Sequence, residues 1–250
     1  MKRELSEITK ARYARVLKSY FDADREKLRP YSSLAQSSRV ILAAALRHAG
    51  YKELAESIVY AQRSRKDLEI PDEEDLKRLE LAMGEVLEEA EGHVALFTLK
   101  VGLRSFEVLN LTRKQVEAAA KTGILRVRRK NDYEANVGVG PSARNHLATL
   151  LTLPRKGRGT AEWDTLAQAI STKGTFTAGY SALRSSVRKA SIAAGLAAKS
   201  PHWLRHAFAT RMSRRGASVT QVQKQLGHVN GATTLRYLHA NMDEVLKLVE

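Results

Sequence analysis

Two histidines and an arginine lie close together in a short segment near the carboxyl end of the chain. Within residues 200–212, His202, Arg205 and His206 are three or four positions apart. If this segment is a helix, that spacing puts the three side chains on one face. A guanidinium can hold an anion through paired donors, and an imidazole can transfer a proton near neutral pH. The segment therefore combines anion binding with proton transfer.

The flanking residues predict that this segment is a helix. Ser200 and Pro201 are typical of a helix start, and Gly216 is typical of a helix end. Apolar side chains recur every four residues and should form the core-facing stripe: Leu204, Phe208 and Met212. We therefore expect the cationic face to point away from the main apolar stripe.

Two more residues with reactive side chains follow. Ser218 and Gln221 fit a capping box, and Gly227 ends the helix that they begin, so His228 follows directly. A third short helix carries Tyr237 between leucines. Taken singly, such a tyrosine is usually a packing residue, and a histidine after a helix-ending glycine usually caps the helix. The case for chemistry therefore depends on the combination of motifs.

That combination resembles the ordered motifs of the tyrosine recombinase, or phage integrase, family. The matching segments read PHWLRHAFAT at 201–210 and QLGHVNGATTLRYLH at 225–239. Upstream, VGLRSFEVLNLT at 101–112 matches the context of the family's first arginine, which corresponds to Arg104. The resemblance covers roughly residues 72–240. Motifs in the right order are far more specific than any one of them.

The family also has a lysine on a β-hairpin shortly after the first arginine. Residues 124–141, ILRVRRKNDYEANVGVGP, show the near-alternation typical of a small hairpin or three-stranded sheet. Lys130 lies where the family's lysine is expected. The segment lacks the common Gly-Lys-Gly-x-Lys pattern, so Arg128 and Arg129 remain alternatives.

The resemblance implies nucleophilic attack on a DNA phosphodiester. Tyr237 would attack phosphorus to give a 3′-phosphotyrosine and a free 5′-hydroxyl. A tyrosine hydroxyl has a reference pKa of about 10, so a nearby base must ease its proton loss. His202 is the candidate base, and Lys130 would protonate the departing 5′-oxygen as the general acid.

The other matched residues would meet the negative charge of the phosphate. Its five-coordinate transition state gains charge, which positioned cations must stabilise. Arg104 and Arg205 suit this role, because each guanidinium can grip two oxygens. The resemblance further implies that His228 hydrogen-bonds the phosphate and that Glu107 orients the arginine and histidine side chains.

The same resemblance implies a reaction without a cofactor, because the phosphotyrosine keeps the energy of the broken bond. The chain has no cysteine for a thiolate metal site, and its seven histidines show no HExxH spacing. No cluster of carboxylates suits magnesium. We therefore expect neither a cofactor nor a metal site.

The charge of the chain is large and uneven. Its 250 residues include 42 Lys+Arg and 27 Asp+Glu, a formal net charge of +15. Residues 71–92 hold nine acids and two bases, whereas residues 165–242 hold eleven bases and no acid. Such an acid-free stretch favours a polyanionic partner. Its basic residues are not gathered on an amphipathic membrane-binding helix, so we expect double-stranded DNA rather than a membrane.

Composition also bears on the protein class and compartment. Hydrophobic residues make up 43% of the chain, enough for one or two cores, which excludes a disordered basic tail. No apolar run approaches the roughly 20 residues of a membrane span, and MKRELSEITKARY lacks the core of a secretory signal. We expect a cytoplasmic, nucleoid-associated protein of prokaryotic, plasmid or viral origin.

The apolar periodicity predicts a mainly α fold with a small antiparallel sheet. Residues 4–65 read as helices, and the charge changes sign near Pro71. We therefore expect a helical, DNA-contacting core-binding domain at 1–68 and a catalytic domain at 69–250. Helices of the catalytic domain are expected up to Glu91 and over 94–109, 142–151, 161–170 and 180–195, with three more after them. The resemblance implies that the two domains form a C-shaped clamp on DNA.

The leading functional hypothesis is site-specific recombination through a Holliday junction, for integration, excision or resolution. One alternative is a non-catalytic DNA-binding regulator, because residues 218–228 could form part of a helix-turn-helix. Another is a type IB topoisomerase-like enzyme that nicks and reseals a single duplex. The complete set of site residues in the expected order favours the enzyme, because a non-catalytic regulator does not need these residues.

The last residues form an amphipathic tail over 241–249. This tail could pack on its own domain. The resemblance instead implies an exchange helix that docks into a neighbouring subunit and gives a homo-tetramer on two DNA sites. Accessory proteins would then set the direction of the reaction.

Overall fold

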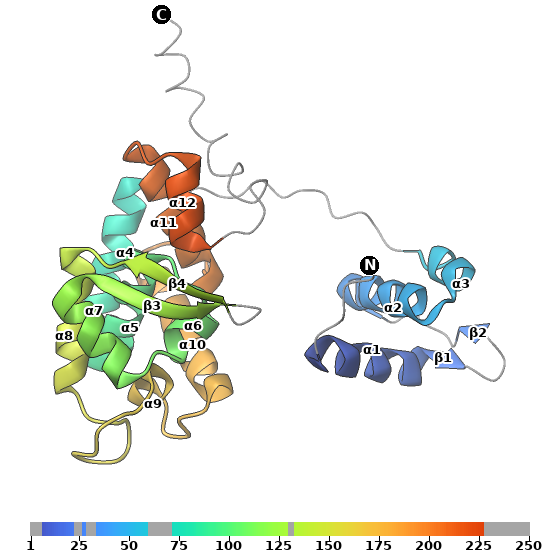
Figure 1. Ribbon diagram of the computed structural model, residues 1–250, viewed down its shortest axis with the longest axis horizontal. Helices are drawn as coiled ribbons and strands as arrows, with labels where there is room; N and C mark the ends of the chain where they lie inside the picture. The colour runs from blue at the N-terminus through green and yellow to red at the C-terminus, as the bar shows by residue number, and fades with distance from the viewer. Residues whose placement is uncertain (1–6, 23–26, 29–33, 60–71, 130–132, 228–250) are drawn as a thin grey trace, which may run out of the picture. The chain divides into compact units, whose positions relative to one another are not determined.

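A computed structural model of the chain contains two compact units, residues 1–68 and 69–250 (Figure 1). Both are built mainly from helices, as the sequence predicts, and each also contains a small antiparallel sheet. None of the helices in the described part of the chain is long and apolar enough to cross a membrane. The structure describes residues 7–22, 27–28, 34–59, 72–129 and 133–227.

The smaller unit is a set of helices around a small apolar core. Helix α2 carries most of that core, with Leu42 and Leu46 fully buried, and it packs against α1 and α3. Gly50 ends α2 in the left-handed conformation, which glycine adopts without a Cβ clash. A short antiparallel pair of strands, which the sequence pattern does not predict, follows α1. The elements are α1 (Glu7–Tyr20), β1 (Phe21–Asp22), β2 (Lys27–Leu28), α2 (Gln36–Ala49) and α3 (Lys52–Glu56).

Helix α5 (Glu89–Val101) is the centre of the larger unit. It is apolar on nearly every side, and a helix with that pattern is buried by its neighbours. Figure 1 shows it surrounded by other helices, and all of them contribute to one continuous apolar core. These neighbours are α4 (Glu73–Glu85), α8 (Pro141–Thr152), α9 (Leu166–Ile170), α10 (Phe176–Ala193) and α11 (Pro201–Arg214).

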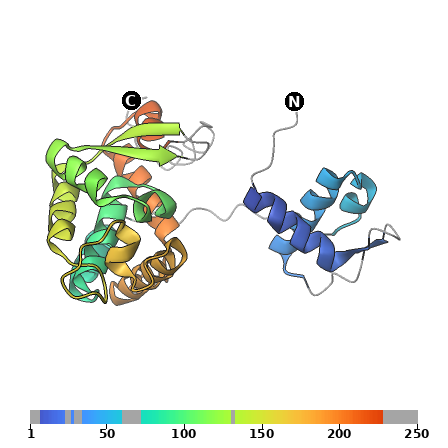
Figure 2. The same ribbon diagram turned by 60° about the horizontal axis from the view of Figure 1, so that its bottom comes forward.

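A β-hairpin lies along one side of this helical core (Figure 2). Strand β3 (Ile124–Arg129) pairs antiparallel with β4 (Tyr133–Gly138), so the hairpin has two strands within the described residues. Side chains alternate along β3, and Leu125, Val127 and Arg129 are buried. Helix α7 (Arg113–Thr122) packs against β3, and α12 (Val219–Leu226) packs against β4.

Several element boundaries differ from the sequence prediction. The single helix expected over 94–109 is wrong: α5 ends at Val101, and the short α6 (Ser105–Leu109) follows. The cause is Gly102, whose φ of +71° breaks the helix and whose missing side chain leaves room for the Phe208 ring. Helix α7 was not predicted, although Thr112 and Gln115 form its capping box. Helix α4 ends at Glu85 rather than Glu91, α9 begins at Leu166, and α10 begins at Phe176.

Candidate active site

Arg104 and Glu107 form an ion pair at the start of α6. The Glu107 carboxylate accepts hydrogen bonds from the Arg104 backbone N–H at 2.9 Å and from Arg104 Nη1 at 3.0 Å. The side chain of Glu107 is 2% exposed, whereas that of Arg104 is 42% exposed. The buried carboxylate therefore holds the arginine from the protein interior, and the guanidinium stays accessible to solvent.

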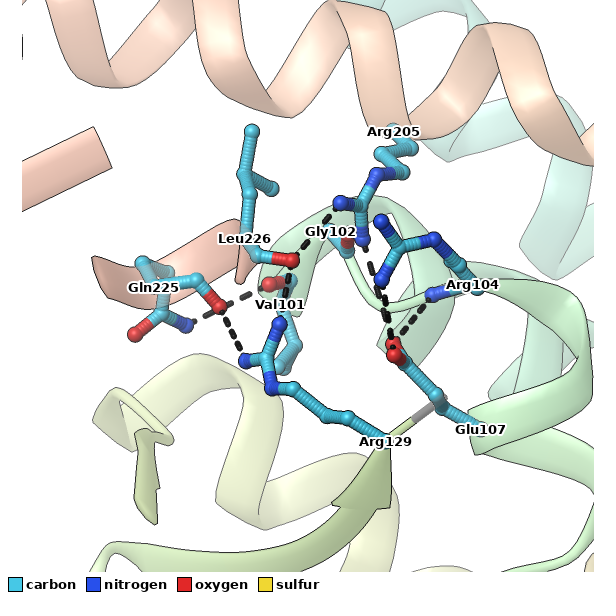
Figure 3. A network of polar contacts seen from close by, with 8 residues as sticks. All are labelled: Val101, Gly102, Arg104, Glu107, Arg129, Arg205, Gln225 and Leu226. Atoms are coloured by element: carbon cyan, nitrogen blue, oxygen red, sulfur yellow. Dashed lines mark hydrogen bonds and ion pairs between the residues drawn. The ribbon is translucent and has the colours of Figure 1, made fainter. Parts of the chain in front are cut away.

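Arg205, on the second turn of α11, is buried beside this pair. Its Nη1 donates to the Gly102 carbonyl at 2.9 Å and lies 3.9 Å from Glu107 Oε2. Its Nη2 donates to the Leu226 carbonyl at 2.7 Å (Figure 3). Arg205 does not lie on an exposed cationic face: the residue is only 1% exposed, although its helix has the expected apolar stripe elsewhere. One guanidinium thus joins the ends of α5 and α12.

Arg129, at the end of β3, reaches the same carbonyl from the hairpin. Its Nη1 donates to Leu226 O, and its Nη2 donates to Gln225 O at 2.9 Å (Figure 3). Its Nε is buried and has no hydrogen-bond partner among the described residues. Burial lowers the pKa of Arg129, and nearby Arg104 lowers it further, while the Glu107 charge opposes both.

These four residues, Arg104, Glu107, Arg129 and Arg205, form what we call the arginine network. Within the part of the chain that the structure describes, Arg104 and Arg205 pair with the one carboxylate of this network, and Arg129 joins Arg205 on the Leu226 carbonyl. A centre with this excess of positive charge is suited to an incoming anion.

His202 lies at the edge of the arginine network, one turn before Arg205. Its ring is 4.4 Å from the His206 ring, in an edge-to-face arrangement. Partial burial lowers the pKa of His202, and the positive charges of Arg205 and Arg104 lower it further. This shift favours the neutral imidazole, the form that can accept a proton.

The structure brings together Arg104, Glu107, His202 and Arg205 from the set predicted from the sequence. The other predicted residues, Lys130, His228 and Tyr237, lie outside the described residues, as do the tail and the helix expected to carry Tyr237. Within the described ranges, no three His, Cys, Asp or Glu side chains are placed to hold a metal ion.

Two participants were missed or misplaced by sequence reasoning. Arg129 was considered as an alternative general acid, but it is buried and engaged with α12. The alternation of β3 contains the signal, because Arg129 shares a face with the buried Leu125 and Val127. No sequence motif pointed to Gln225. Its side-chain amide bonds the end of α12 to the end of β4, because it accepts from Gly138 N at 3.0 Å and donates to Gly138 O at 2.9 Å.

Known proteins resemble this chain in sequence. A profile of the phage integrase family matches residues 72–244. Tyrosine recombinase XerD of Brucella abortus is 34% identical over 169 residues, covering 66% of this chain and 53% of that protein. Tyrosine recombinase XerC of Lactobacillus leichmannii is 31% identical over 159 residues, covering 61% of this chain and 50% of that one. The chain thus matches about half the length of these relatives.

Solved structures share the fold at lower sequence identity. The Tn1549 transposon integrase in complex with transposon right end DNA has a TM-score of 0.65 and 16% identity, covering 99% of this chain and 95% of that one. The XerA recombinase has a TM-score of 0.58 and 20% identity, covering 98% of this chain and 91% of that one. These likenesses agree with the mainly helical architecture with small antiparallel sheets.

Proposed function

The chain belongs to the phage integrase family, and from this premise we propose that it is a site-specific tyrosine recombinase that cleaves and rejoins DNA strands. The observation that carries the proposal is the arginine network. The network contains three guanidinium groups and one buried carboxylate, and one of the arginines, Arg104, is accessible from solvent. A phosphodiester is the anion that this centre would meet on DNA.

The proposed role of Arg104 and Arg205 is to bind the scissile phosphate and stabilise its transition state. Arg104 would contact the phosphate oxygens directly, since its guanidinium is held at one end by Glu107. Arg205 would act from a buried position, where its guanidinium is anchored on the carbonyls of Gly102 and Leu226. Preorganised cations of this kind cost no reorganisation when charge develops during the reaction.

Tyr237 is the proposed nucleophile, and His202 is the proposed base. The lowered pKa of His202 supports this role, because a neutral imidazole is available at physiological pH. The attack would form a bond between the tyrosine oxygen and phosphorus and break the bond between phosphorus and the 5′-oxygen. Lys130 would give its proton to that oxygen, and His228 would donate a hydrogen bond to the phosphate. A 5′-hydroxyl from a second strand would reverse the step, which leads to a Holliday junction.

The smaller unit is proposed to add DNA contacts as a core-binding domain. Residues 1–68 contain 15 Lys and Arg against eight Asp and Glu. Helix α1 exposes several of these bases, among them Arg12, Arg15 and Lys18. Such a basic helix face suits the DNA backbone. With the catalytic unit at 69–250, it would close around the duplex as a C-shaped clamp.

Assembly as a homo-tetramer on paired sites is also part of the proposal. Residues 241–250 would dock into a neighbouring subunit, and accessory proteins would set the direction of exchange. Similar folds have been solved on DNA, including the XerH site-specific recombinase bound to a palindromic difH substrate.

A trapping experiment tests the proposed reaction. A pool of nicked duplexes with randomised flanking sequence is incubated with the protein, so that the short cleaved strand diffuses away and prevents rejoining. We expect an adduct that resists SDS and is destroyed by protease, and sequencing of the trapped DNA would give the target site. Tyr237→Phe should form no adduct. The matched control is Tyr180→Phe, which removes the hydroxyl of an exposed tyrosine and should form the adduct as the wild type does.

The recovered site then separates recombination from the alternatives. Two copies of it on one plasmid should yield recombined products with the wild-type protein. Relaxation of a supercoiled plasmid without recombined products would indicate a topoisomerase, and binding without any adduct would indicate a regulator. Adduct formation by Tyr237→Phe would contradict the assigned nucleophile.

A further inference from the structure

One buried arginine connects the two segments that lead to the proposed general acid and to His228. Arg129 is the residue directly before Lys130, and it bonds to the last two carbonyls of α12, Gln225 O and Leu226 O. Gly227 separates that helix end from His228. The guanidinium therefore ties the last residue of β3 to the last turn of α12 (Figure 3).

The contact is well matched to a helix end. The last carbonyls of a helix lack partners within the helix, and the helix dipole places negative potential there. Gly227, at a φ of +65°, lets the guanidinium pack against its backbone, since a Cβ there would collide with Arg129. Arg205 bonds to the same Leu226 carbonyl from α11. The end of α12 is thus held from both the hairpin and α11.

Stability alone is a poor reason for burying Arg129. The residue is 7% exposed, and its Nε is buried with no hydrogen-bond partner among the described residues. A buried donor without a partner is unfavourable, and apolar residues of similar volume often replace buried charges without loss. The two carbonyl contacts, by contrast, fix one position of the hairpin relative to α12.

We infer that Arg129 is a positioning residue: it ties the end of β3 to the end of α12 and so fixes the two points from which the chain continues to Lys130 and to His228. The inference rests on the proposed function, because it concerns delivery of the proton to the 5′-oxygen. Arg129 itself transfers no proton and contacts no DNA in this role. Its effect passes through the neighbouring residues.

The test compares Arg129→Met with Arg126→Met. Arg126 lies on the same strand, but its side chain is 71% exposed, so this variant is the matched control. Single-turnover cleavage is measured on the trapped site with a normal phosphodiester and with a 5′-bridging phosphorothiolate. A thiolate leaves without being protonated, so the second substrate does not need the general acid.

For Arg129→Met we expect cleavage of the normal substrate to slow by about 100-fold, as for a catalytic group misplaced by about 1 Å. Cleavage of the phosphorothiolate should stay within about threefold of wild type, because proton transfer is no longer required. Arg126→Met should match wild type on both. An equal loss on both substrates, or no loss on either, would overturn the positioning role. Arg129→Lys, which can keep one carbonyl contact, should lie between wild type and Arg129→Met on the normal substrate.

Amide hydrogen exchange gives a readout that does not depend on DNA cleavage. In Arg129→Met, exchange should accelerate at both 125–129 and 222–227, whereas Arg126→Met should change neither segment. If the wild-type protein forms no adduct with any DNA, the proposed function fails, while coupled exchange would still show that Arg129 ties the two segments. Unchanged exchange at 222–227 would refute the tie itself.

Discussion

Two charged networks meet helix α11, and they differ in how their charges are balanced. The arginine network has three guanidinium groups and one carboxylate. The second, which we call the balanced network, pairs Lys100 and Arg211 with Glu80 and Glu73. Glu80 accepts from Lys100 Nζ and from Arg211 Nη1, each at 2.7 Å. The same residue types therefore build a centre with excess positive charge in one place and a neutral one in the other.

The difference separates a site for chemistry from a brace between helices. The balanced network joins α4, α5 and α11, and its cations already have carboxylate partners. Burial alone would raise the pKa of Glu80, but hydrogen bonds from Lys100 and Arg211 outweigh it and lower that pKa. The arginine network has too few carboxylates to do the same, so a phosphate would complete it.

The largest effect is expected from Arg205→Lys. An ammonium cannot hold the carbonyls of Gly102 and Leu226 together and still present a guanidinium's charge to the phosphate. We expect cleavage to fall by about 10³-fold, in the range for loss of an arginine that stabilises a phosphoryl transition state. Affinity for DNA should change little, because many other phosphate contacts remain.

Single-turnover cleavage and fluorescence anisotropy on the same DNA measure these two quantities. The control is Arg211→Lys, in the same helix but in the balanced network, which should cleave at nearly the wild-type rate. Unchanged cleavage by Arg205→Lys, or an equal loss in both variants, would remove the distinction between the networks.

The outcome of Arg205 also shows how far sequence reasoning could reach. The resemblance to the family's motifs predicted Arg104, Glu107 and His202 as site residues, and the Arg104–Glu107 contact follows from their spacing, since residues three apart at a helix start are neighbours. It could not tell that Arg205 is buried, since periodicity assigns a charged residue to the polar face. Burial of a charge depends on partners from distant segments, here Gly102 and Leu226, and no local pattern contains them.

The fold shows the same division between local and long-range information. The mainly helical class, the hairpin and the start of α11 are predictable, because each depends on apolar periodicity or local capping residues. The break between α5 and α6 was missed because apolar spacing continues through Gly102, and only the Phe208 ring from α11 shows why a glycine is needed. Local residue patterns predict which helices and strands form, whereas tertiary packing determines where each of them ends.

Two isosteric substitutions, Glu107→Gln and Glu80→Gln, compare the carboxylate of the arginine network with one of the balanced network. Glu107→Gln keeps a hydrogen-bond acceptor for Arg104 but removes the charge that orients the arginines. We expect cleavage to slow by about 10- to 100-fold. Stability should also fall by about 3 kcal/mol, because the buried guanidinium of Arg205 loses its counter-charge. Glu80→Gln should cost only about 1–2 kcal/mol, intermediate between exposed and buried ion pairs, and leave cleavage near wild type.

Thermal unfolding followed by circular dichroism, with cleavage assayed well below the melting temperature, separates the two effects. A loss of 1–2 kcal/mol lowers the melting temperature by roughly 4 °C in a chain of this size. If Glu80→Gln impaired cleavage as strongly as Glu107→Gln, the balanced network would have to be part of the active site.

A smaller effect concerns the pKa of His202, which the excess charge of the arginine network lowers. Partial burial is the main cause, followed by Arg205 and Arg104. Replacing Arg104 by Gln removes one positive charge, so the pKa of His202 should rise toward its ordinary value. Titration of the histidine ring by NMR should therefore give a midpoint below 6.5 in the wild type and a higher one in Arg104→Gln. Arg126→Gln, on the exposed face of β3, is the control, and an equal shift in both variants would contradict the assigned cause.

The smallest effect on cleavage should arise beside the balanced network, where a lowered histidine pKa affects stability rather than chemistry. His146 Nδ1 lies 2.9 Å from His93 Nδ1, and burial, His93 and Lys100 lower the pKa of His146 to about 4. Since its ordinary pKa is 6.5, the unfolded chain binds the proton more readily between these values. The stability that the neutral form of His146 contributes is therefore fully present above pH 6.5 and is lost as the pH falls toward 4. Melting temperatures at pH 7, 6 and 5 should decrease in that order, and His146→Gln should make the decrease shallower. The same slope in both proteins would show that the histidine pair does not respond to the charge around it.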